Sequence, residues 1–357
     1  MRVIGIDPGT VSIDLCGLAD GAVFLDRSIP TAEALGDPEG FVAILRDAAP
    51  ALIAGPSGYG LPLTTVADAD DEVLRLAYLA APGETGGIGG LRALARAFER
   101  AGLPVVFTPG VIHLPTVPAH RKVNRVDMGT ADKVCAAALG VHDQARRMGG
   151  ALRDVSFILL ELGGAFSAAL AVRDGRIVDG QGGTAGPLGV LAAGALDGEV
   201  AFLAGEVDKS LLFRGGVASL VGDAEHAVRR IAEPERPCDR LAREAFLESA
   251  VKAVAALHVV VPHPREILLS GRVARVESIA RELRLRLSPF GPVRQLEGFA
   301  RVSKEAAQGA ALIADGLAGG INEPLTSVLG IREAAGTALD HLYIITRDAA
   351  RRRLGLA

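Results

Sequence analysis

Two glycine turns, each following an apolar strand that ends in an acidic residue, are the first places where this sequence could do chemistry. The turns are Asp7-Pro8-Gly9 and Glu161-Leu162-Gly163-Gly164. Backbone N–H groups in turns without side chains can approach phosphate oxygens, and a carboxylate beside them can hold Mg²⁺ directly or through water. Asp7 is thus a candidate magnesium ligand and catalytic residue, and Thr10 could bond the outermost phosphate. The simpler alternative is a tight hairpin with no ligand.

A second group of reactive side chains lies at 113–133, between a predicted strand and a predicted helix. Its cations could neutralise an anionic substrate and the charge that spreads over a transferred phosphoryl group. Asp127 could accept a proton from a hydroxyl nucleophile, whereas a carboxylate nucleophile needs no base. The alternative is a solvated basic loop before a helix capped by Thr130 or Asp127. The candidate catalytic residues here are His113, Arg121, Asp127 and Lys133, and the candidate substrate contacts are His120 and Arg125.

Two further glycine-rich segments, 55–60 and 182–186, follow predicted strands. Ligands of open α/β sheets bind beyond the carboxyl ends of strands, so both segments could line a cleft, although a surface turn is an equally simple interpretation. The candidate substrate contacts are Ser57, Gly58, Tyr59, Gly183 and Thr184. A third glycine-rich tract, 83–90, lacks the Gly-Lys-Ser/Thr of a P-loop and is predicted to be a loop.

An internal repeat with an offset of 154 residues indicates how these positions are held. Laying the chain on itself places Val3–Asp7 on Phe157–Glu161, Gly9 on Gly163, and Asp20-Gly21 on Asp174-Gly175. Each copy predicts a strand ending in an acid, a glycine turn, a second strand, an Asp-Gly hairpin turn and a third strand. Helices and strands alternate after each meander, which indicates a mostly parallel sheet. The sequence thus predicts two similar α/β domains, 1–150 and 151–357, facing each other across a cleft.

The remaining elements are predicted from periodicity and turn signals. In the first half we expect strands at 22–29, 51–54 and 105–108, and helices at 38–48, 70–80, 90–101 and 130–148. In the second half we expect strands at 176–179, 266–269 and 293–296, and helices at 238–258, 273–286 and 304–318.

Four short motifs, in order along the chain, resemble those of the acetate and sugar kinase, heat-shock chaperone and actin superfamily. Ile4–Thr10 resembles its first phosphate motif, Leu160–Ser167 its second, Leu268–Val273 its adenosine motif, and Glu305–Ala311 its second connecting helix. The second motif departs from the pattern, because Glu161 stands where Asp is usual and no Thr follows the glycines.

The resemblance implies two actin-like (ribonuclease H-like) domains that flank a cleft for ATP and Mg²⁺. It assigns nucleotide contacts to Gly9, Thr10, Glu161, Gly163, Gly164, Ser270, Gly271 and Arg272, and the metal to Asp7. The first domain would carry the substrate loops and the second the adenosine motif. His113–Pro118 and Arg121–Lys133 resemble more closely an uncharacterised, mainly archaeal family labelled predicted butyrate kinases.

Composition excludes several other classes of protein. With 38 basic and 42 acidic residues, the net charge is −4, which argues against a nucleic-acid binder that relies on positive charge. The three cysteines have neither metal-site nor disulfide spacing. Because no signal peptide is recognised, we expect a cytoplasmic protein. The apolar run 155–172 approaches the length of a membrane span, but Glu161 and the glycines inside it favour two buried strands.

We therefore expect an ATP- and Mg²⁺-dependent kinase that phosphorylates a small molecule. A short carboxylic acid, converted to an acyl phosphate, is the leading substrate class. A hydroxylated small molecule or sugar, with Asp127 as base, is the first alternative. The second is a nucleotide-switched binding or assembly protein without a small-molecule site. The expected partner is the substrate alone, with neither nucleic acid nor membrane, and a homodimer is left open.

Overall fold

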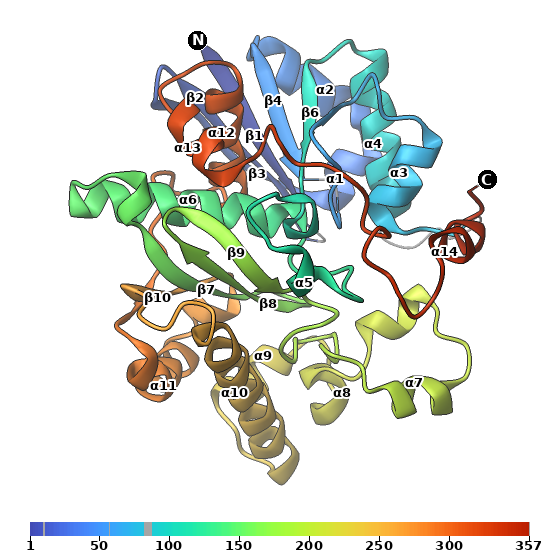
Figure 1. Ribbon diagram of the computed structural model, residues 1–357, viewed down its shortest axis with the longest axis vertical. Coiled ribbons are helices and arrows are strands. Elements are labelled where there is room, and N and C mark those ends of the chain that lie inside the picture. Colours follow the sequence, from blue (N-terminus) through green and yellow to red (C-terminus); the bar gives the residue numbers. More distant parts are fainter. Residues whose placement is uncertain (10, 57, 82–87, 357) are drawn as a thin grey trace.

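The computed structural model describes residues 1–9, 11–56, 58–81 and 88–356. Two mixed sheets dominate the molecule, one above and one below a central layer of helices (Figure 1). The mixed α/β fold class predicted from the alternating pattern is therefore confirmed. No helix in the described part of the chain has the length and apolar character needed to cross a membrane.

The first sheet has the strand order β3-β2-β1-β4-β6-β5. Its strands are β1 (Arg2–Pro8), β2 (Ser12–Ala19), β3 (Ala22–Pro30), β4 (Leu52–Pro56), β5 (Thr64–Thr65) and β6 (Val105–Thr108). Strands β1, β2 and β3 form an antiparallel meander, and β4 and β6 extend the sheet in parallel with β1.

The second sheet repeats this arrangement in the order β11-β10-β7-β8-β9. Its strands are β7 (Ser156–Leu162), β8 (Ser167–Arg173), β9 (Arg176–Gln181), β10 (Glu266–Ser270) and β11 (Val293–Gln295). Again three strands form an antiparallel meander, and β10 and β11 run parallel to the first of them.

The repeat extends to irregular features of the backbone. Each meander has a shift of register between its second and third strands, at Gly17/Leu18 and at Ala171/Val172, again 154 residues apart. Both Asp-Gly turns have positive φ at their two residues, as a two-residue hairpin turn of type I′ requires. The two halves of the chain thus fold on one local plan.

Helices fill the space around the sheets. In the first half they are α1 (Thr31–Gly36), α2 (Pro38–Asp47), α3 (Asp71–Tyr78), α4 (Ile88–Arg100), α5 (Ala119–Lys122) and α6 (Ala131–Met148). In the second half they are α7 (Gly198–Ala204), α8 (Val217–Val221), α9 (Ala227–Ala232), α10 (Pro237–His258), α11 (Glu277–Leu287), α12 (Glu305–Leu317), α13 (Glu323–Leu329) and α14 (Arg347–Arg353). Short 3-10 turns occur at η1 (Val111–His113), η2 (Leu152–Asp154), η3 (Lys209–Phe213), η4 (Val273–Arg275) and η5 (Ser288–Phe290).

One predicted helix is wrong in form. The segment 273–286 is not continuous, because η4 ends at Arg275 and Val276 adopts an extended conformation before α11 begins. The predicted helix at 70–80 ends two residues early, since Leu79 has a left-handed conformation.

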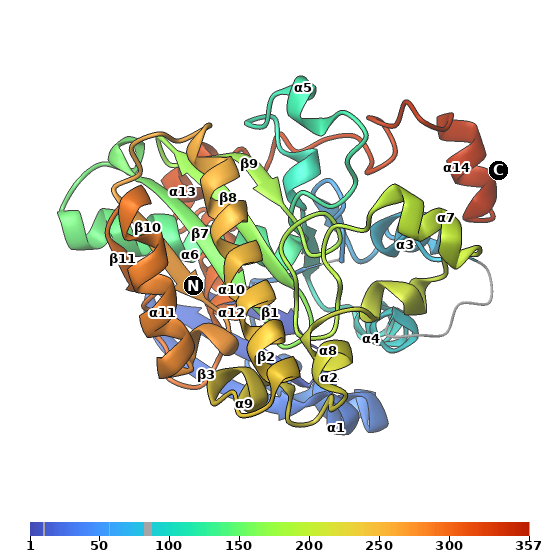
Figure 2. The same cartoon turned by 90° about the horizontal axis from the view of Figure 1, so that it is seen from below.

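Helices α6 and α12 pack against each other between the two sheets (Figures 1 and 2). Although α12 belongs to the second half of the chain, it packs on β1, β2 and β4 of the first sheet. A Cβ on Gly309 would lie 1.7 Å from the Cys135 carbonyl oxygen, so only glycine allows the two helices to approach so closely. One hydrophobic core therefore spans both halves, and the partition at residue 150 remains a prediction from sequence.

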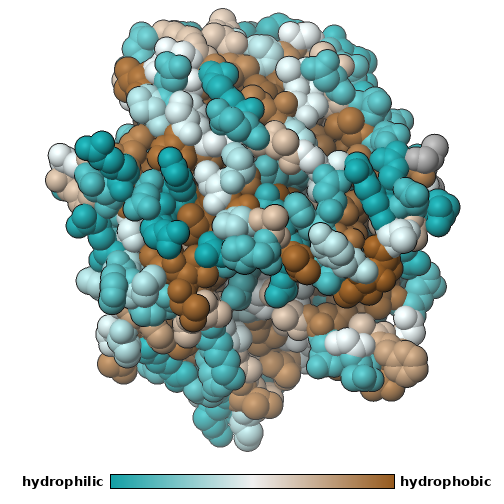
Figure 3. All heavy atoms as spheres, viewed as in Figure 1, coloured by the Kyte–Doolittle hydropathy of each residue, from teal (hydrophilic) through white to brown (hydrophobic). Residues whose placement is uncertain are grey.

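The view of Figure 3 shows a surface of mixed character, with hydrophilic side chains interrupted by apolar patches. The most exposed large apolar side chains include Phe202 and Leu203 on α7, and Ile344 just before α14.

Candidate functional site

The two glycine turns form the same hairpin at equivalent ends of β1 and β7. The N–H of Gly9 donates to the carbonyl of Ser12 at 3.0 Å, and the N–H of Gly163 donates to that of Phe166 at 3.0 Å. The two donors are 154 residues apart in the chain, and so are the two acceptors. Both turns lie at the carboxyl end of a buried central strand, where ligands of such sheets bind.

Four charged side chains, which we call the carboxylate cluster, join the two hairpins: Asp7, Asp132, Lys133 and Glu161. Lys133, near the start of α6, donates to Asp132 at 2.6 Å and to Glu161 at 2.7 Å. Lys133 also acts electrostatically on Asp7, which is buried at the end of β1. The cluster itself therefore has three carboxylates and one ammonium group, and a second cation from outside it, Lys304, also acts on Asp7.

The pKa values of the cluster reflect this imbalance. Burial, together with the charge of Asp132, raises the pKa of Asp7 to about 7. Burial likewise raises the pKa of Glu161. For Asp132 burial acts in the same direction, but Lys133 outweighs it and holds the pKa below its usual value. A further cation would relieve this repulsion.

The cluster suits a magnesium ion that keeps most of its waters. The second oxygen of Glu161, Oε2, is buried without a hydrogen-bond partner in the described chain, and Asp7 is held at a raised pKa. The described residues contain no group of three or more His, Cys, Asp or Glu that could enclose a metal ion. Mg²⁺ usually binds one or two carboxylates and several waters, so Asp7 fits the role of such a ligand.

Lys304, which immediately precedes α12, brings a second cation to the first hairpin. Its ammonium group lies 2.6 Å from the Asp14 carboxylate and donates to the Ser12 hydroxyl at 2.7 Å. A Cβ on Gly9 would lie 3.1 Å from this ammonium group. Lys304 thus lies where the bare backbone of the first hairpin faces outward.

Sequence reasoning missed both Lys304 and Asp14. Asp14 carried a usable signal in the sequence, because it is a charged residue inside an apolar strand. In the structure its side chain lies in β2 and is only 1% exposed. Lys304 carried no comparable signal. Its position depends on Asp26, whose carboxylate accepts three backbone N–H groups of residues 301–303, at 2.7–2.9 Å.

The adenosine-like motif lies beside the second hairpin. β10 pairs with β7 so that Ser270 is opposite Glu161, and Ser270 is buried. Gly271 has a φ of +85°, and a Cβ there would lie 2.4 Å from the Leu162 carbonyl oxygen. The backbone conformation and the close approach of Leu162 alone require glycine at this position. The predicted role of Gly271 beside a nucleotide would be a second reason for glycine there. Arg272 extends over Gly164, with its Cδ 3.1 Å from where a Cβ on that glycine would be.

Two candidate substrate residues, Tyr59 and Thr184, meet the candidate catalytic residue Asp127 in a second cluster, which we call the tyrosine cluster. The carboxylate of Asp127 accepts from the Thr184 N–H at 2.9 Å and from the Thr184 hydroxyl at 3.0 Å. The side chains of Thr184 and Asp127 both act on the Tyr59 hydroxyl. Burial raises the pKa of Asp127, and also that of Tyr59.

The glycines next to Thr184 allow this meeting. A Cβ on Gly182 would lie 1.6 Å from Asp127 Oδ1, so any other residue would displace the carboxylate. A Cβ on Gly183 would lie 2.6 Å from the Cβ of Phe166, which belongs to the second hairpin. Gly58, with a φ of +67°, packs against the Tyr78 ring.

The η3 turn lies against the tyrosine cluster and the second hairpin. The Lys209 ammonium group lies 5.0 Å from the centre of the Tyr59 ring. The Phe213 ring meets the Phe166 ring edge-on, with 4.9 Å between centroids. A short segment that no sequence pattern singled out therefore contacts both the tyrosine cluster and the second hairpin.

The other cations at 113–133 do not form one site with Lys133. Arg121 donates to the Val178 carbonyl at 2.7 Å and lies 3.8 Å from Asp179. Arg125 and His120 are exposed and act on the same Asp179 of β9. Thr130 takes the N-cap position of α6, but its hydroxyl donates to Asp132 instead of capping the backbone.

His113 is buried under the loop that precedes α14. It is 3% exposed, its Nδ1 has no hydrogen-bond partner in the described chain, and its carbonyl accepts from the Ala335 N–H. Burial lowers its pKa to about 4, so the ring is neutral at pH 7. Neutral histidine does not supply the positive charge that the sequence led us to expect.

We expect His113 to make the fold acid-sensitive. An unfolded histidine titrates near 6.5, so between pH 6.5 and 4 the unfolded chain binds a proton that the folded chain excludes. The contribution of His113 to the free energy of unfolding is present above pH 6.5 and is lost as the pH falls toward 4. Between pH 7 and pH 5 the loss is about 2 kcal/mol. Denaturant unfolding at pH 7 and at pH 5 should show that the free energy of unfolding falls by about 2 kcal/mol less in His113→Gln than in the wild type. An equal loss in both proteins would contradict the assignment.

Three predicted features, Thr10, Ser57 and most of the 83–90 tract, lie outside the described residues. The structure neither supports nor opposes their predicted roles.

Comparisons with known proteins agree with this fold. Residues 5–344 match the model of a family described as proteins of unknown function, DUF1464. No curated protein matches the sequence. Among solved structures, a propionate kinase from Francisella tularensis is similar at 13% identity, over 86% of this chain and 98% of that one, with a TM-score of 0.61. An acetate kinase from Porphyromonas gingivalis has 13% identity over 87% and 98%, with a TM-score of 0.59.

An acetate kinase from Entamoeba histolytica is similar at 10% identity, over 81% of this chain and 87% of that one, with a TM-score of 0.58. Identities this low establish the fold alone. They confirm the actin-like architecture that the four motifs implied. The chain belongs to the DUF1464 family, and its fold is that of the acetate and sugar kinase, heat-shock chaperone and actin superfamily.

Proposed function

We propose that this protein is an ATP- and Mg²⁺-dependent kinase that converts a short carboxylic acid to an acyl phosphate. The observation that carries the proposal is the convergence of both glycine hairpins, the Ser270-Gly271 turn and the carboxylate cluster at the carboxyl ends of the central strands. The acetate and propionate kinases with the same fold support the substrate class.

The chain supplies positioning and charge for such a transfer. Backbone amides of both hairpins would contact phosphate oxygens, and Lys304 would neutralise charge at the outermost phosphate. Asp7 would hold the magnesium ion, which would neutralise phosphate charge that develops during the transfer. Lys133 holds Glu161, at the end of β7, close to Asp132, and its charge also acts on Asp7 at the end of β1.

The state of Asp127 favours an acid over an alcohol as substrate. Its oxygens accept from the Thr184 N–H, the Thr184 hydroxyl and the Gly129 N–H. A general base must be within reach of the proton that it takes, and these three bonds fill most of the about four acceptor positions of a carboxylate. A carboxylate substrate needs no base. A hydroxylated substrate, with Asp127 released from Thr184, is the second candidate.

ATP turnover measured with a panel of short acids and a matched panel of polyols tests the proposal. We expect stimulation by acids, with formation of a hydroxylamine-reactive acyl phosphate. Stimulation by polyols alone would instead indicate that the substrate is a hydroxylated small molecule. Slow basal hydrolysis that no compound stimulates would instead support a nucleotide-switched binding protein.

We expect Lys304→Gln to weaken phosphate handling. The variant should raise the KM for ATP and lower kcat/KM by about 100-fold, since one charged donor at a developing charge contributes roughly 10²–10³. Lys304→Arg should keep more of the activity because it retains the charge. Steady-state kinetics at saturating acid measures the effect.

Loss of Lys304 also leaves Asp14 buried without its cation, so stability must be separated from catalysis. Asp14→Asn combined with Lys304→Gln removes that uncompensated charge and should restore stability without restoring turnover. Lys252→Gln, at an exposed lysine paired with Glu248 on α10, is the matched control and should change neither property. Normal kcat/KM in Lys304→Gln would refute the phosphate role.

A further inference from the structure

Several cations around the candidate site are engaged by carboxylates of the chain itself. In the basic run before α6, His113 is neutral at pH 7, while Lys133 and Arg121 each lie beside a carboxylate of the protein. Lys304, at the first hairpin, is paired with Asp14. These groups balance charges of the chain, so the carboxylate of an acid substrate needs a further cation.

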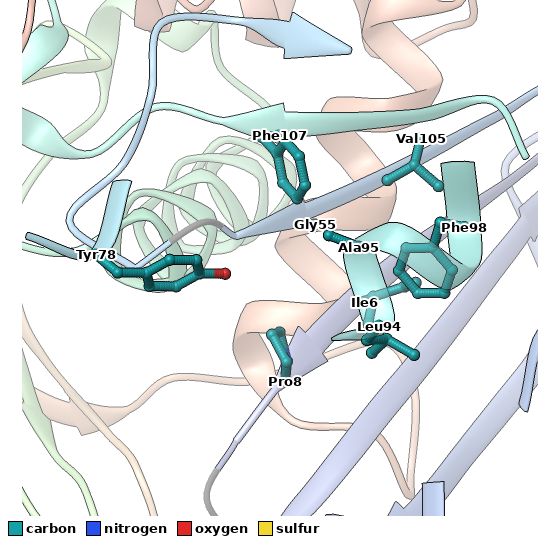
Figure 4. A pocket seen from close by; sticks show the side chains of 9 residues that line it. All are labelled: Ile6, Pro8, Gly55, Tyr78, Leu94, Ala95, Phe98, Val105 and Phe107. Carbon is teal, nitrogen blue, oxygen red and sulfur yellow. The ribbon is translucent and has the colours of Figure 1, made fainter. Parts of the chain in front are cut away.

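The apolar cavity between the first sheet and α4 does not supply that cation (Figure 4). Its volume is about 30 Å³, and the residues that line it, which include Ile6, Phe98 and Phe107, carry no charge. A carboxylate that moves from water into such surroundings loses its hydration without compensation, at a large cost in free energy. The charged end of an acid must therefore bind elsewhere.

Lys209 of η3 brings a cation from the second half of the chain to the tyrosine cluster. Its ammonium group lies over the Tyr59 ring, 5.0 Å from the ring centre. The polar partners of this tyrosine, Thr184 and Asp127, act on its hydroxyl instead. Unlike a carboxylate, an aromatic ring attracts an ammonium group without cancelling its positive charge. The positive charge of Lys209 is thus at the ring face, whereas the negative charge of Asp127 is at the hydroxyl.

The η3 turn holds this lysine between the two halves of the chain. Asp208, just before η3, accepts from the Leu211 N–H at 3.0 Å, which fixes the start of the turn. Four residues after Lys209, the Phe213 ring meets the Phe166 ring of the second hairpin edge-on. One short turn therefore contacts a loop of the first half through its lysine and a hairpin of the second half through its phenylalanine.

The loop that carries Tyr59 is fixed close to the carboxylate cluster. The carbonyl of Gly58 accepts from the N–H of the first residue of α6 at 3.0 Å, two residues before Lys133. The charge of Lys133 also acts on Asp127. An anion that binds Lys209 would therefore lie between this loop and the second hairpin, next to the place proposed for the phosphates.

We propose that Lys209 binds the carboxylate of the acid substrate and selects acids over alcohols. This inference rests on the proposed function. A lysine binds one carboxylate oxygen with its single ammonium group, whereas the planar fork of arginine engages both oxygens. The second oxygen remains free to attack the outermost phosphorus of ATP. As that bond forms, the bond from this phosphorus to the bridging oxygen breaks, ADP leaves with the electron pair, and no proton is transferred.

Substitution of Lys209 should affect the acid far more than the nucleotide. Lys209→Gln should raise the KM for acetate about 30-fold, through the loss of one charge-assisted hydrogen bond, and should change the KM for ATP by less than about threefold. Lys209→Arg retains the charge and should keep the KM for acetate within about fivefold of the wild type. Lys252→Gln, at an exposed lysine of α10, is the matched control and should alter neither KM. If Lys209→Arg binds acetate as weakly as Lys209→Gln, the charge of Lys209 is not what binds the acid, and the inference is wrong.

Acetate binding without nucleotide tests the site independently of catalysis. The chain has three tyrosines and no tryptophan, so ring-labelled tyrosine resolves Tyr59 by NMR, with Tyr59→Phe for assignment. Acetate should shift the Tyr59 signal saturably in the wild type and not in Lys209→Gln. Acetamide has nearly the same shape without the charge and should bind at least about tenfold more weakly. Equal shifts with acetate and acetamide, or an acetate shift that persists in Lys209→Gln, would overturn the inference.

Turnover separates the two proposals. Acetate binding at Tyr59 that depends on Lys209, with no acid-stimulated ATP turnover, would overturn the kinase and leave the anion site. Acid-stimulated turnover with the same KM for acetate in Lys209→Gln and in the wild type would overturn the role of Lys209 and leave the kinase.

Discussion

Asp7→Asn is expected to abolish magnesium-dependent ATP turnover, by at least about 100-fold, while the protein remains folded. The folded chain holds this buried carboxylate at a raised pKa of about 7, against an ordinary 3.8. Above pH 7 it is charged at a cost to stability that the neutral amide does not carry. In the absence of metal, the variant should therefore be as stable as the wild type or more so. Activity assays and thermal unfolding test both parts.

A magnesium titration makes the same point without turnover. Mg²⁺ should raise the melting temperature of the wild type, because the ion binds only the folded state, and should have no such effect on Asp7→Asn. Asp174→Asn is the matched control, since it makes the same change in an exposed turn that also accepts asparagine. Full activity in Asp7→Asn, or equal Mg²⁺ stabilisation of both proteins, would exclude Asp7 as the ligand.

The hairpins were predictable because their information is local. The Asp-Gly turns, the acid at the end of each strand and the following glycine all fall within about 20 residues, and they recur at one fixed offset. Turn chemistry and strand alternation are short-range signals, so a single sequence reveals them. The short helices α7, α8 and α9 were not predicted, since five to seven residues contain too few turns for a helical period to emerge.

The partners of the site were less predictable because they are distant in the chain. Lys304 meets Ser12 across 292 residues, and Lys133 meets Glu161 across 28. Charged residues in the run 113–133 looked like one site, yet η1, α5 and α6 direct them to three places. Asp132 and Lys133 reach the carboxylate cluster, whereas Asp127 reaches the tyrosine cluster. Sequence proximity identified reactive residues, and tertiary packing decided which of them meet.

Lys133→Met is expected to be the most destabilising single change in the site. The lysine side chain is 12% exposed and is the only ammonium group that directly contacts Asp132 and Glu161 among the described residues. Removing one partner of a buried ion pair typically costs 3–5 kcal/mol, because a charge is left uncompensated. Denaturant unfolding at pH 7.5 should show a loss of this size, whereas Lys252→Met, at an exposed pair, should lose less than about 1 kcal/mol.

The pH dependence of the Lys133→Met variant identifies the cause of that loss. Without Lys133, the carboxylates that burial disfavours take up protons more readily in the folded chain than in the unfolded one. Stability of the variant should therefore rise as the pH falls from 8 toward 5, and adding Glu161→Gln should recover part of the loss at pH 7.5. Recovery of stability without recovery of turnover would show that Lys133 serves both the fold and the reaction. A loss that neither acid nor Glu161→Gln relieves would mean that packing of the lysine stem, and not its charge, holds the two hairpins together.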